Sequence, residues 1–228
     1  FFNGGLLKNG TIVGTHTSIQ APITQLFFSD IAVQGTWLVD EVYPDWFGCH
    51  YDYDTATHIG TDDSAAFNKA VEMAENCDIR KVKLSSGTYY IDEPIYIHKG
   101  NILIEGVSGQ LREEMNEGEH PYYDYSVTSI NTKASTIFVD HACDGIVIAD
   151  SVCNSVMIEH VNLTAILPSS NTDNSGYISN AIHFKSDYYG PTWPVILKYC
   201  HFENFHHAFY LNSTHFRYSI YKLEFDHC

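Results

Sequence analysis

The stretch from Gly60 to Gly106 constrains the fold most, because its hydrophobic period changes from that of a helix to that of strands. Residues 61–64, Thr-Asp-Asp-Ser, offer side-chain oxygens and negative charge to the free backbone donors of a helix start. Apolar residues then recur at three- and four-residue spacing, which predicts a helix over residues 62–75 with one buried face. This face consists of Ala66, Phe67, Ala70, Val71 and Ala74.

After Cys77 apolar and polar residues alternate, as they do in strands. Gly, Pro and Asn residues interrupt the alternation, so each predicted strand is short. A helix followed by such strands is typical of a chain that winds into a solenoid, with the helix covering its open end. We therefore expect Phe67, Ala70 and Val71 to close the N-terminal mouth. The expected strands lie near residues 81–84, 89–91, 95–97 and 102–104.

Four segments resemble the start of the right-handed parallel β-helix of the pectate-lyase-like superfamily. They are PDWFG (Pro44 to Gly48), TDDSAAFNKAVEMA, VKLSSGTYYI and ILIEGVSG. The usual first motif ends in Trp-Phe-Gly-Ala, and Cys49 replaces the Ala here. The resemblance covers residues 1 to about 110 and implies an all-β fold, a right-handed parallel β-helix with an N-terminal capping helix. The superfamily includes polysaccharide lyases, glycosidases, epimerases and phage tailspikes, so the resemblance indicates the fold more strongly than the reaction.

The pattern divides the chain into three parts. Residues 1–43 are expected to form a preliminary β coil, with short strands near 11–13, 18–20, 26–28 and 31–33. Residues 44–60 are expected to form a polar surface connection. Residues 61–228 are expected to hold the capping helix and the first coils of one β-helix domain, which is truncated because the chain stops partway through a coil.

Later coils can be aligned with one another. Residues 145–149, 181–185 and 208–212 align as equivalent strands, whose first and third apolar residues are predicted to point inward. A second alignment equates residues 158–163, 197–202 and 220–225. The predicted inward sets are Ile146, Ile182 and Phe209, and then Ile148, Phe184 and Leu211. The predicted outward set is Val147, His183 and Tyr210.

The net charge of -16, from 28 acidic and 12 basic residues, argues against nucleic acid as a partner. An acidic polysaccharide would also be repelled on average, unless a local cationic groove overcame the field. No segment approaches the roughly 20 apolar residues of a membrane span.

The six cysteines show no CxxC pair and no zinc spacing, so they are expected to be free thiols without a structural disulfide. If any disulfide forms, we expect it between Cys143 and Cys153, which flank one strand. No cofactor is expected. The aspartates around Asp52 and Asp54 match no EF-hand loop, although calcium occurs in the family, and His206, His207 and His215 lack a set of metal ligands.

Three kinds of function remain open. A lyase acting on uronic acids needs a base, an acid and a group that neutralises the carboxylate, and His183, Tyr210 and Lys185 could supply them from neighbouring strands. They could equally be ordinary outward residues of a wide sheet. A hydrolase needs two carboxylates about 5 to 10 Å apart. Asp187, Glu203, Glu224 and Asp226 give no persuasive pair, and the Asn171-Thr172-Asp173 triplet is weak on its own.

Binding without chemistry would use aromatic platforms in two loops, assisted by Asp124 and Asp187 as acceptors of sugar hydroxyls. These rings could instead fix the loops to the scaffold. The candidate platform residues are Tyr122, Tyr123 and Tyr125 in one loop, and Tyr188, Tyr189 and Trp193 in the other.

The sequence favours a polysaccharide lyase or glycosidase that acts on an extracellular polysaccharide, from a bacterium or its phage. The alternative is a non-catalytic structural or receptor-binding segment of a phage tailspike or tail fibre, in which case a homotrimer is expected. Either protein would lie outside the cytoplasm, at a cell surface or on a virion.

Overall fold

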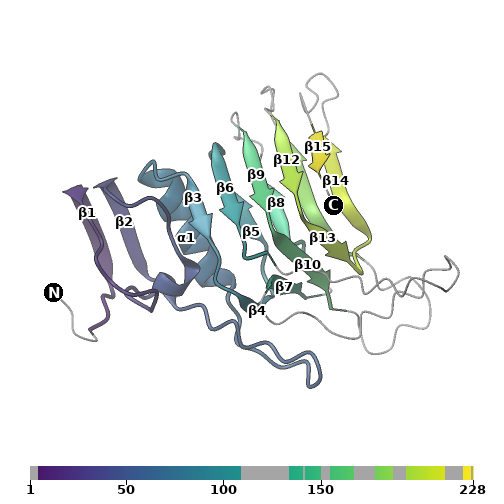
Figure 1. Cartoon of the computed structure of the whole chain (residues 1–228), viewed down its shortest axis with the longest axis horizontal. Coiled ribbons are helices and arrows are strands. Elements are labelled where there is room, and N and C mark those ends of the chain that lie inside the picture. The colour runs from purple at the N-terminus through teal and green to yellow at the C-terminus, as the bar shows by residue number, and fades with distance from the viewer. Residues whose placement is uncertain are drawn as a thin grey trace, which may run out of the picture.

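The computed structural model describes residues 5–108, 134–140, 142–149, 155–166, 178–186, 194–213, 223–226 and 228. Within these residues the chain is mostly β, with parallel sheets and one α-helix. The strands lie side by side along the long axis of the molecule, and the helix α1 (Ser64–Asn76) stands between β2 (Ile31–Trp37) and β3 (Lys81–Lys83), as Figure 1 shows.

Three sheets contain all the described strands after α1, and every third strand along the chain returns to the same sheet. Neighbouring strands are parallel throughout. The five-stranded sheet is β3, β6 (Ile102–Glu105), β9 (Val156–Glu159), β12 (Val195–Lys198) and β15 (Leu223–Asp226). One four-stranded sheet is β4 (Gly87–Ile91), β7 (Ser135–Val139), β10 (Val161–Ala165) and β13 (His201–Glu203). The other is β5 (Ile95–Ile97), β8 (Ile146–Ile148), β11 (Asn180–Ser186) and β14 (His207–Ser213).

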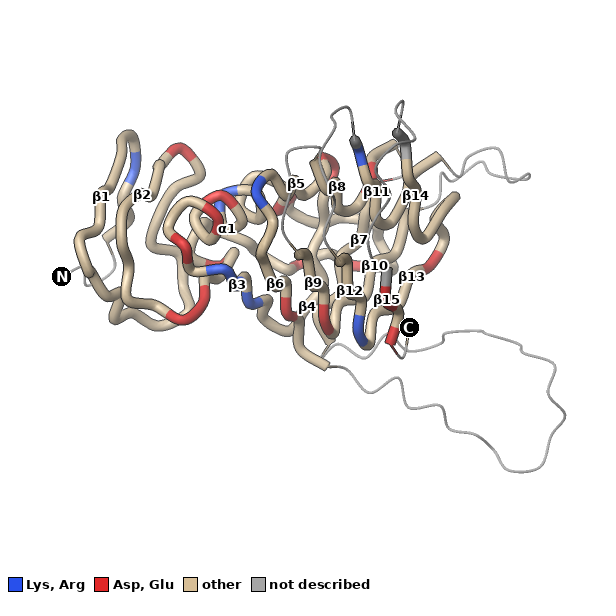
Figure 2. Tube along the Cα trace, turned by 90° about the horizontal axis from the view of Figure 1, so that it is seen from above, with Lys and Arg blue, Asp and Glu red and all other residues tan. Residues whose placement is uncertain are grey.

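Seen from above in Figure 2, the β3-containing sheet and the β5-containing sheet run along opposite long sides of the molecule. Between them lies one continuous core of aliphatic side chains, which the strand alternation turns inward. Ile104, Ile137 and Ile182 are examples, and each is essentially inaccessible to solvent.

The first coil alignment is confirmed residue by residue. Ile182 pairs with Ile146 and Phe209, and His183 pairs with Val147 and Tyr210. Two details differ from the predicted burial. Val147 was predicted to point outward but is buried at 4% exposure, while Leu211 was predicted to point inward but is 48% exposed. Leu211 is open because β14 is the last described strand of its sheet, so nothing described covers it from the next position.

The second alignment is confirmed in part. Ile158 pairs with Leu197, and Leu163 pairs with Phe202, as predicted. The alignment of the last segment, residues 220–225, was wrong, because Phe225 pairs with Leu197 rather than with Phe202. Alternation repeats every two residues, so it fixes which side chains point inward but not which neighbouring strand they join.

The N-terminal segments form less regular structure than predicted. The strands β1 (Gly10–Thr17) and β2 pair in parallel as a separate sheet. Residues 18–20 form no strand, and near 26–28 only Phe27 makes an isolated bridge, with Leu7. The segment 44–60 is not polar throughout, because its first part is the buried 3-10 helix η1 (Pro44–Phe47). Trp46 and Phe47 join the core there, since both are large and apolar.

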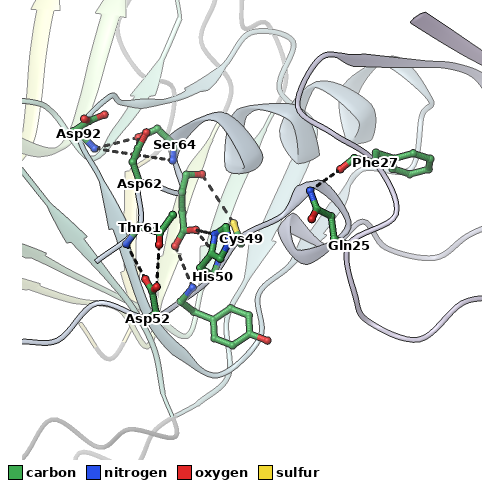
Figure 3. A network of polar contacts seen from close by, with 11 residues as sticks. Gln25, Phe27, Cys49, His50, Asp52, Thr61, Asp62, Ser64 and Asp92 are labelled. Carbon is green, nitrogen blue, oxygen red and sulfur yellow. Dashed lines mark hydrogen bonds and ion pairs between the residues drawn. The ribbon is translucent and has the colours of Figure 1, made fainter. Parts of the chain in front are cut away.

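The helix starts two residues later than predicted and buries the expected face. Phe67, Ala70 and Val71 are all at most 1% exposed. The start itself differs from the prediction, because Asp63 occupies the N-cap position but its carboxylate accepts no capping hydrogen bond from the first-turn amides. Asp62 instead accepts from the Ser64 amide at 2.9 Å, which Figure 3 shows.

The outer edges of β3 and β4 are covered by backbone from earlier in the chain. The Val42 amide donates to the Lys81 carbonyl at 2.9 Å, and the Asp63 amide donates to the Tyr90 carbonyl at 2.8 Å. Pairing of this kind removes the free edge that a first strand would otherwise present.

The edge of β5 is covered by side chains of α1 instead. Asn68 accepts from the Tyr96 amide at 2.8 Å and donates to the Pro94 carbonyl at 2.9 Å. One carboxylate oxygen of Glu75 accepts from the amides of His98, Lys99 and Gly100. The helix therefore covers the edge of β5 with polar groups as well as packing its apolar face against the core.

The five described cysteines are free thiols, and Cys200 is buried as its inward position predicts. Cys153 lies outside the described residues, so the absence of a disulfide among all six stays a prediction. No helix in the described ranges is long and apolar enough to cross a membrane.

Candidate functional site

His183 on β11 and Tyr210 on β14 lie next to each other on the outer face of their sheet. The two residues are in register, and their ring centroids are 5.1 Å apart with the planes inclined by 59°. The predicted proximity of this pair is confirmed. Parallel pairing brings them together, because it stacks equivalent positions of successive strands.

A carboxylate that the sequence reasoning missed orients His183. Oδ2 of Asp144 lies 2.6 Å from Nδ1 of His183. An ionised carboxylate can only accept, so Nδ1 carries the hydrogen, and in the neutral ring Nε2 is the proton acceptor. Asp144 stands two residues before β8, and the register of β8 with β11 places it level with Asn180, from where its side chain reaches His183.

Asn180 extends this contact to a second histidine. Its backbone amide and its side-chain amide both donate to Oδ1 of Asp144, at 2.8 and 2.7 Å. Its carbonyl oxygen lies 2.9 Å from Nδ1 of His207. The ring of His207 stacks on that of Tyr210, with centroids 5.1 Å apart and planes inclined by 22°. We call these five residues the β8–β11–β14 cluster: Asp144, Asn180, His183, His207 and Tyr210.

A signal for the missed residues was present in the sequence. The alignment of 145–149 with 181–185 and 208–212 stopped one position short. Extended by one residue toward the N-terminus, it places Asp144, Asn180 and His207 in one polar column. The expectation that His206 and His207 are surface residues is correct in exposure, but His207 belongs to a strand and is hydrogen-bonded.

The other ring nitrogen of His183 is unusual. Nε2 is shielded from solvent and has no hydrogen-bond partner among the described residues. A buried nitrogen in this state is normally satisfied by water or by a ligand, so it marks a position where a polar group would be stabilised.

Lys185 lies exposed two residues further along β11, on the same face as His183. No hydrogen bond or ion pair joins it to His183 or Tyr210 within the described ranges. The proposed sugar-binding residues Tyr122, Tyr123, Asp187, Tyr188, Tyr189 and Trp193 lie outside the described residues, as do Asp124, Tyr125, Asn171 to Asp173 and His215.

A pair of carboxylates does occur in register, on the β3-containing sheet, although it was not among the predicted acids. Glu105 on β6 pairs with Glu159 on β9. Burial alone would raise the pKa of Glu105, but hydrogen bonds from Lys81 and Lys83 hold this pKa below its ordinary value. A general acid for glycoside hydrolysis needs a raised pKa, so Glu105 fits an ion-pair network better than catalysis. The described residues contain no group of three or more His, Cys, Asp or Glu that could hold a metal ion.

Comparisons with known proteins give one match. Depolymerase 1, capsule K3-specific, of Klebsiella phage KP32 is 38% identical over 60 residues. The aligned segment covers 26% of this chain and 7% of that protein, so the chain spans only a small part of the relative's length. No protein-family model matches the chain, and no solved structure matches it. This short similarity does not test the resemblance to the pectate-lyase-like superfamily.

Proposed function

We propose that the chain belongs to a virion-associated phage tail protein that cleaves an extracellular, capsule-type polysaccharide by elimination. The observation that carries this proposal is the Asp144-oriented imidazole of His183 beside the phenol of Tyr210. The similarity to a phage capsule depolymerase supports the substrate class. We also infer that the three parallel sheets are the walls of a right-handed parallel β-helix, because every third strand returns to the same sheet.

The proposed reaction needs only groups already described. Nε2 of His183 takes the proton from C5 of a uronic acid, and the electrons of that C–H bond form the C4–C5 double bond. The bond from C4 to the glycosidic oxygen breaks, and the hydroxyl of Tyr210 donates a proton to this leaving oxygen. Lys185 would neutralise the carboxylate of the sugar and so make the C5 proton more acidic. Solvent then returns the proton from His183 to Tyr210.

Access is a requirement of this reaction. Nε2 of His183 is shielded in this structure, so the side chains that cover it must open when the sugar binds. The same shielding favours a second candidate function, in which the chain is a non-catalytic structural or receptor-binding segment of a tailspike. A homotrimer would be expected in that case.

The test combines His183→Ala with Tyr210→Phe and follows turnover of uronic-acid polysaccharides by the ultraviolet absorbance of the unsaturated product. Loss of an acid or base should lower turnover about 100-fold or more. Tyr96→Phe is the matched control, because Tyr96 is exposed on β5 in the same row as Val147 and His183. Unchanged turnover in the folded double variant would overturn the assignment. New reducing ends without the unsaturated product would indicate hydrolysis, and glycan binding without any cleavage would favour the receptor-binding segment.

A further inference from the structure

We propose that Asp144 and Asn180 are positioning residues that hold His183 and His207 in the same tautomer, with Nδ1 protonated and Nε2 as the acceptor. The consequence for catalysis rests on the proposed function. The tautomers themselves are a property of the folded chain and can be measured without any substrate.

The direction of each hydrogen bond follows from the carboxylate of Asp144. This group can only accept, so the Asn180 side-chain atom at 2.7 Å from it must be the amide nitrogen. The other side-chain atom of Asn180 is therefore the carbonyl oxygen, which can also only accept. It faces Nδ1 of His207 at 2.9 Å, so this nitrogen must carry a hydrogen. One carboxylate thus determines the proton position on two imidazoles, although it contacts only one of them.

Burial and register keep this arrangement fixed. Asn180 is 8% exposed, and the side chains of Asp144 and His183 are 20% and 15% exposed, so water competes poorly for their hydrogen bonds. The Asn180 backbone amide adds a second bond to the same carboxylate oxygen, at 2.8 Å. Because Asn180 pairs directly with His207 across β11 and β14, neither side chain has to stretch to reach the other.

The arrangement places the Tyr210 ring in contact with both imidazole rings, at 5.1 Å from each centroid. The two histidines then have different roles. His183 is mostly covered and is the oriented base. His207 is exposed, so its Nε2 can accept a hydrogen bond from a sugar hydroxyl and hold the polysaccharide next to Tyr210.

The test is the nitrogen-15 spectrum of the histidine-labelled protein, at a pH where both imidazoles are neutral. His183→Ala and His207→Ala identify the two sets of signals. Both rings should show a protonated Nδ1 and an unprotonated Nε2. A protonated Nε2 on either ring of the wild-type protein would overturn the proposal.

Two variants then separate the contact of Asp144 with His183 from the contact of Asn180 with His207. Asp144→Asn offers an amide hydrogen to Nδ1 of His183 and should move the ring hydrogen to Nε2, whereas Asn180→Ala should release only His207. Turnover of Asp144→Asn should fall about 100-fold or more with little change in KM, and Asp144→Glu should recover part of it. Glu203→Gln, on a different sheet, is the control. Unchanged signals in folded Asp144→Asn would contradict the positioning role. The expected tautomers in a protein without lyase activity would refute the proposed function and leave this inference intact.

Discussion

At the scale of single residues, Asp63 is a buried side chain whose ionisation is coupled to folding. It is 0% exposed, and its carboxylate accepts from the amides of His50 and Tyr51 at 2.7 and 3.3 Å. Figure 3 shows its neighbours His50, Asp62 and Ser64 around the start of α1. Burial raises the pKa of Asp63 to about 6, although the two amide hydrogen bonds oppose this rise.

This pKa predicts a pH-dependent stability of unusual sign for an aspartate. The folded state holds the Asp63 proton up to a higher pH than the unfolded state, whose pKa is near 3.8. The stabilising contribution is therefore complete below about pH 4 and is lost as the pH rises through about 6. The whole difference is on the order of 3 kcal/mol. Denaturant unfolding at several pH values should show this fall in the wild-type protein relative to Asp63→Asn. Parallel curves for the two proteins would show that Asp63 titrates normally.

The part of the candidate site that sequence could predict was the part that depends on alternation. His183 and Tyr210 occupy equivalent positions of aligned strands, so parallel pairing alone brings them together. Asp144 was missed because it precedes the aligned apolar segment, and Asn180 and His207 because polar residues at strand starts look like turn residues. The directions of their side chains depend on hydrogen bonds that no periodicity reports.

At the scale of elements, helix α1 packs on the first strands of the three sheets through Phe67. This ring is fully buried and meets Tyr89 edge-on, with centroids 5.0 Å apart. Phe67→Ala should lower the free energy of unfolding by about 3 to 5 kcal/mol, because it removes a large buried side chain and leaves a cavity. Glu72→Ala on the outer side of the same helix is the control, and losing its ion pair with Lys69 should change stability by less than about 0.5 kcal/mol. Similar denaturation midpoints for the two variants would contradict a stabilising role of the apolar face of α1.

The polar contact between α1 and β5 makes a separate prediction. Glu75→Ala would leave the amides of His98, Lys99 and Gly100 without their shared acceptor, and should lower stability by about 1 to 2 kcal/mol. Glu75→Gln keeps a carbonyl oxygen and should lose less. Hydrogen exchange of these three amides is the sharper measurement, because it should accelerate in the Ala variant while β4 amides are unaffected. Equal exchange in the wild-type protein and in Glu75→Ala would mean that solvent can already satisfy these three amides.

The elements themselves were predictable where a local pattern decides them. The helix and the short strands after Cys77 follow from hydrophobic period and turn residues, and the structure contains both. The covering of the first strands by Val42, Asn68 and Glu75 was not predictable, because it joins segments that no repeat relates. The predicted alignment of residues 220–225 was wrong, because alternation does not select the partner strand and β15 pairs with β12 instead of β13.

At the scale of the whole molecule, the net charge of -16 repels an acidic polysaccharide and so lowers the affinity for it. Raising the salt from about 0.01 M to about 0.15 M shortens the screening length from about 30 Å to about 8 Å. Affinity for an acidic polysaccharide should therefore improve severalfold with salt, the opposite of the behaviour of a basic binding protein. An uncharged glycan of equal length should bind equally in both buffers. Weaker binding of the acidic glycan at higher salt would show that a local cationic site overcomes the overall charge.

Paired strands are separated by unequal lengths of sequence, and this has a consequence for how the connections between strands can change. Lys81 pairs with Leu103, a short distance along the chain, whereas Ile102 pairs with Val156 after more than twice that separation. The loop-closure entropy of the longer connection exceeds that of the shorter one by less than about 1 kcal/mol. Segments inserted between strands therefore add little to the free energy of the fold and leave the pairing of the sheets unchanged. A scaffold of this kind can acquire new recognition loops without redesign of its interior.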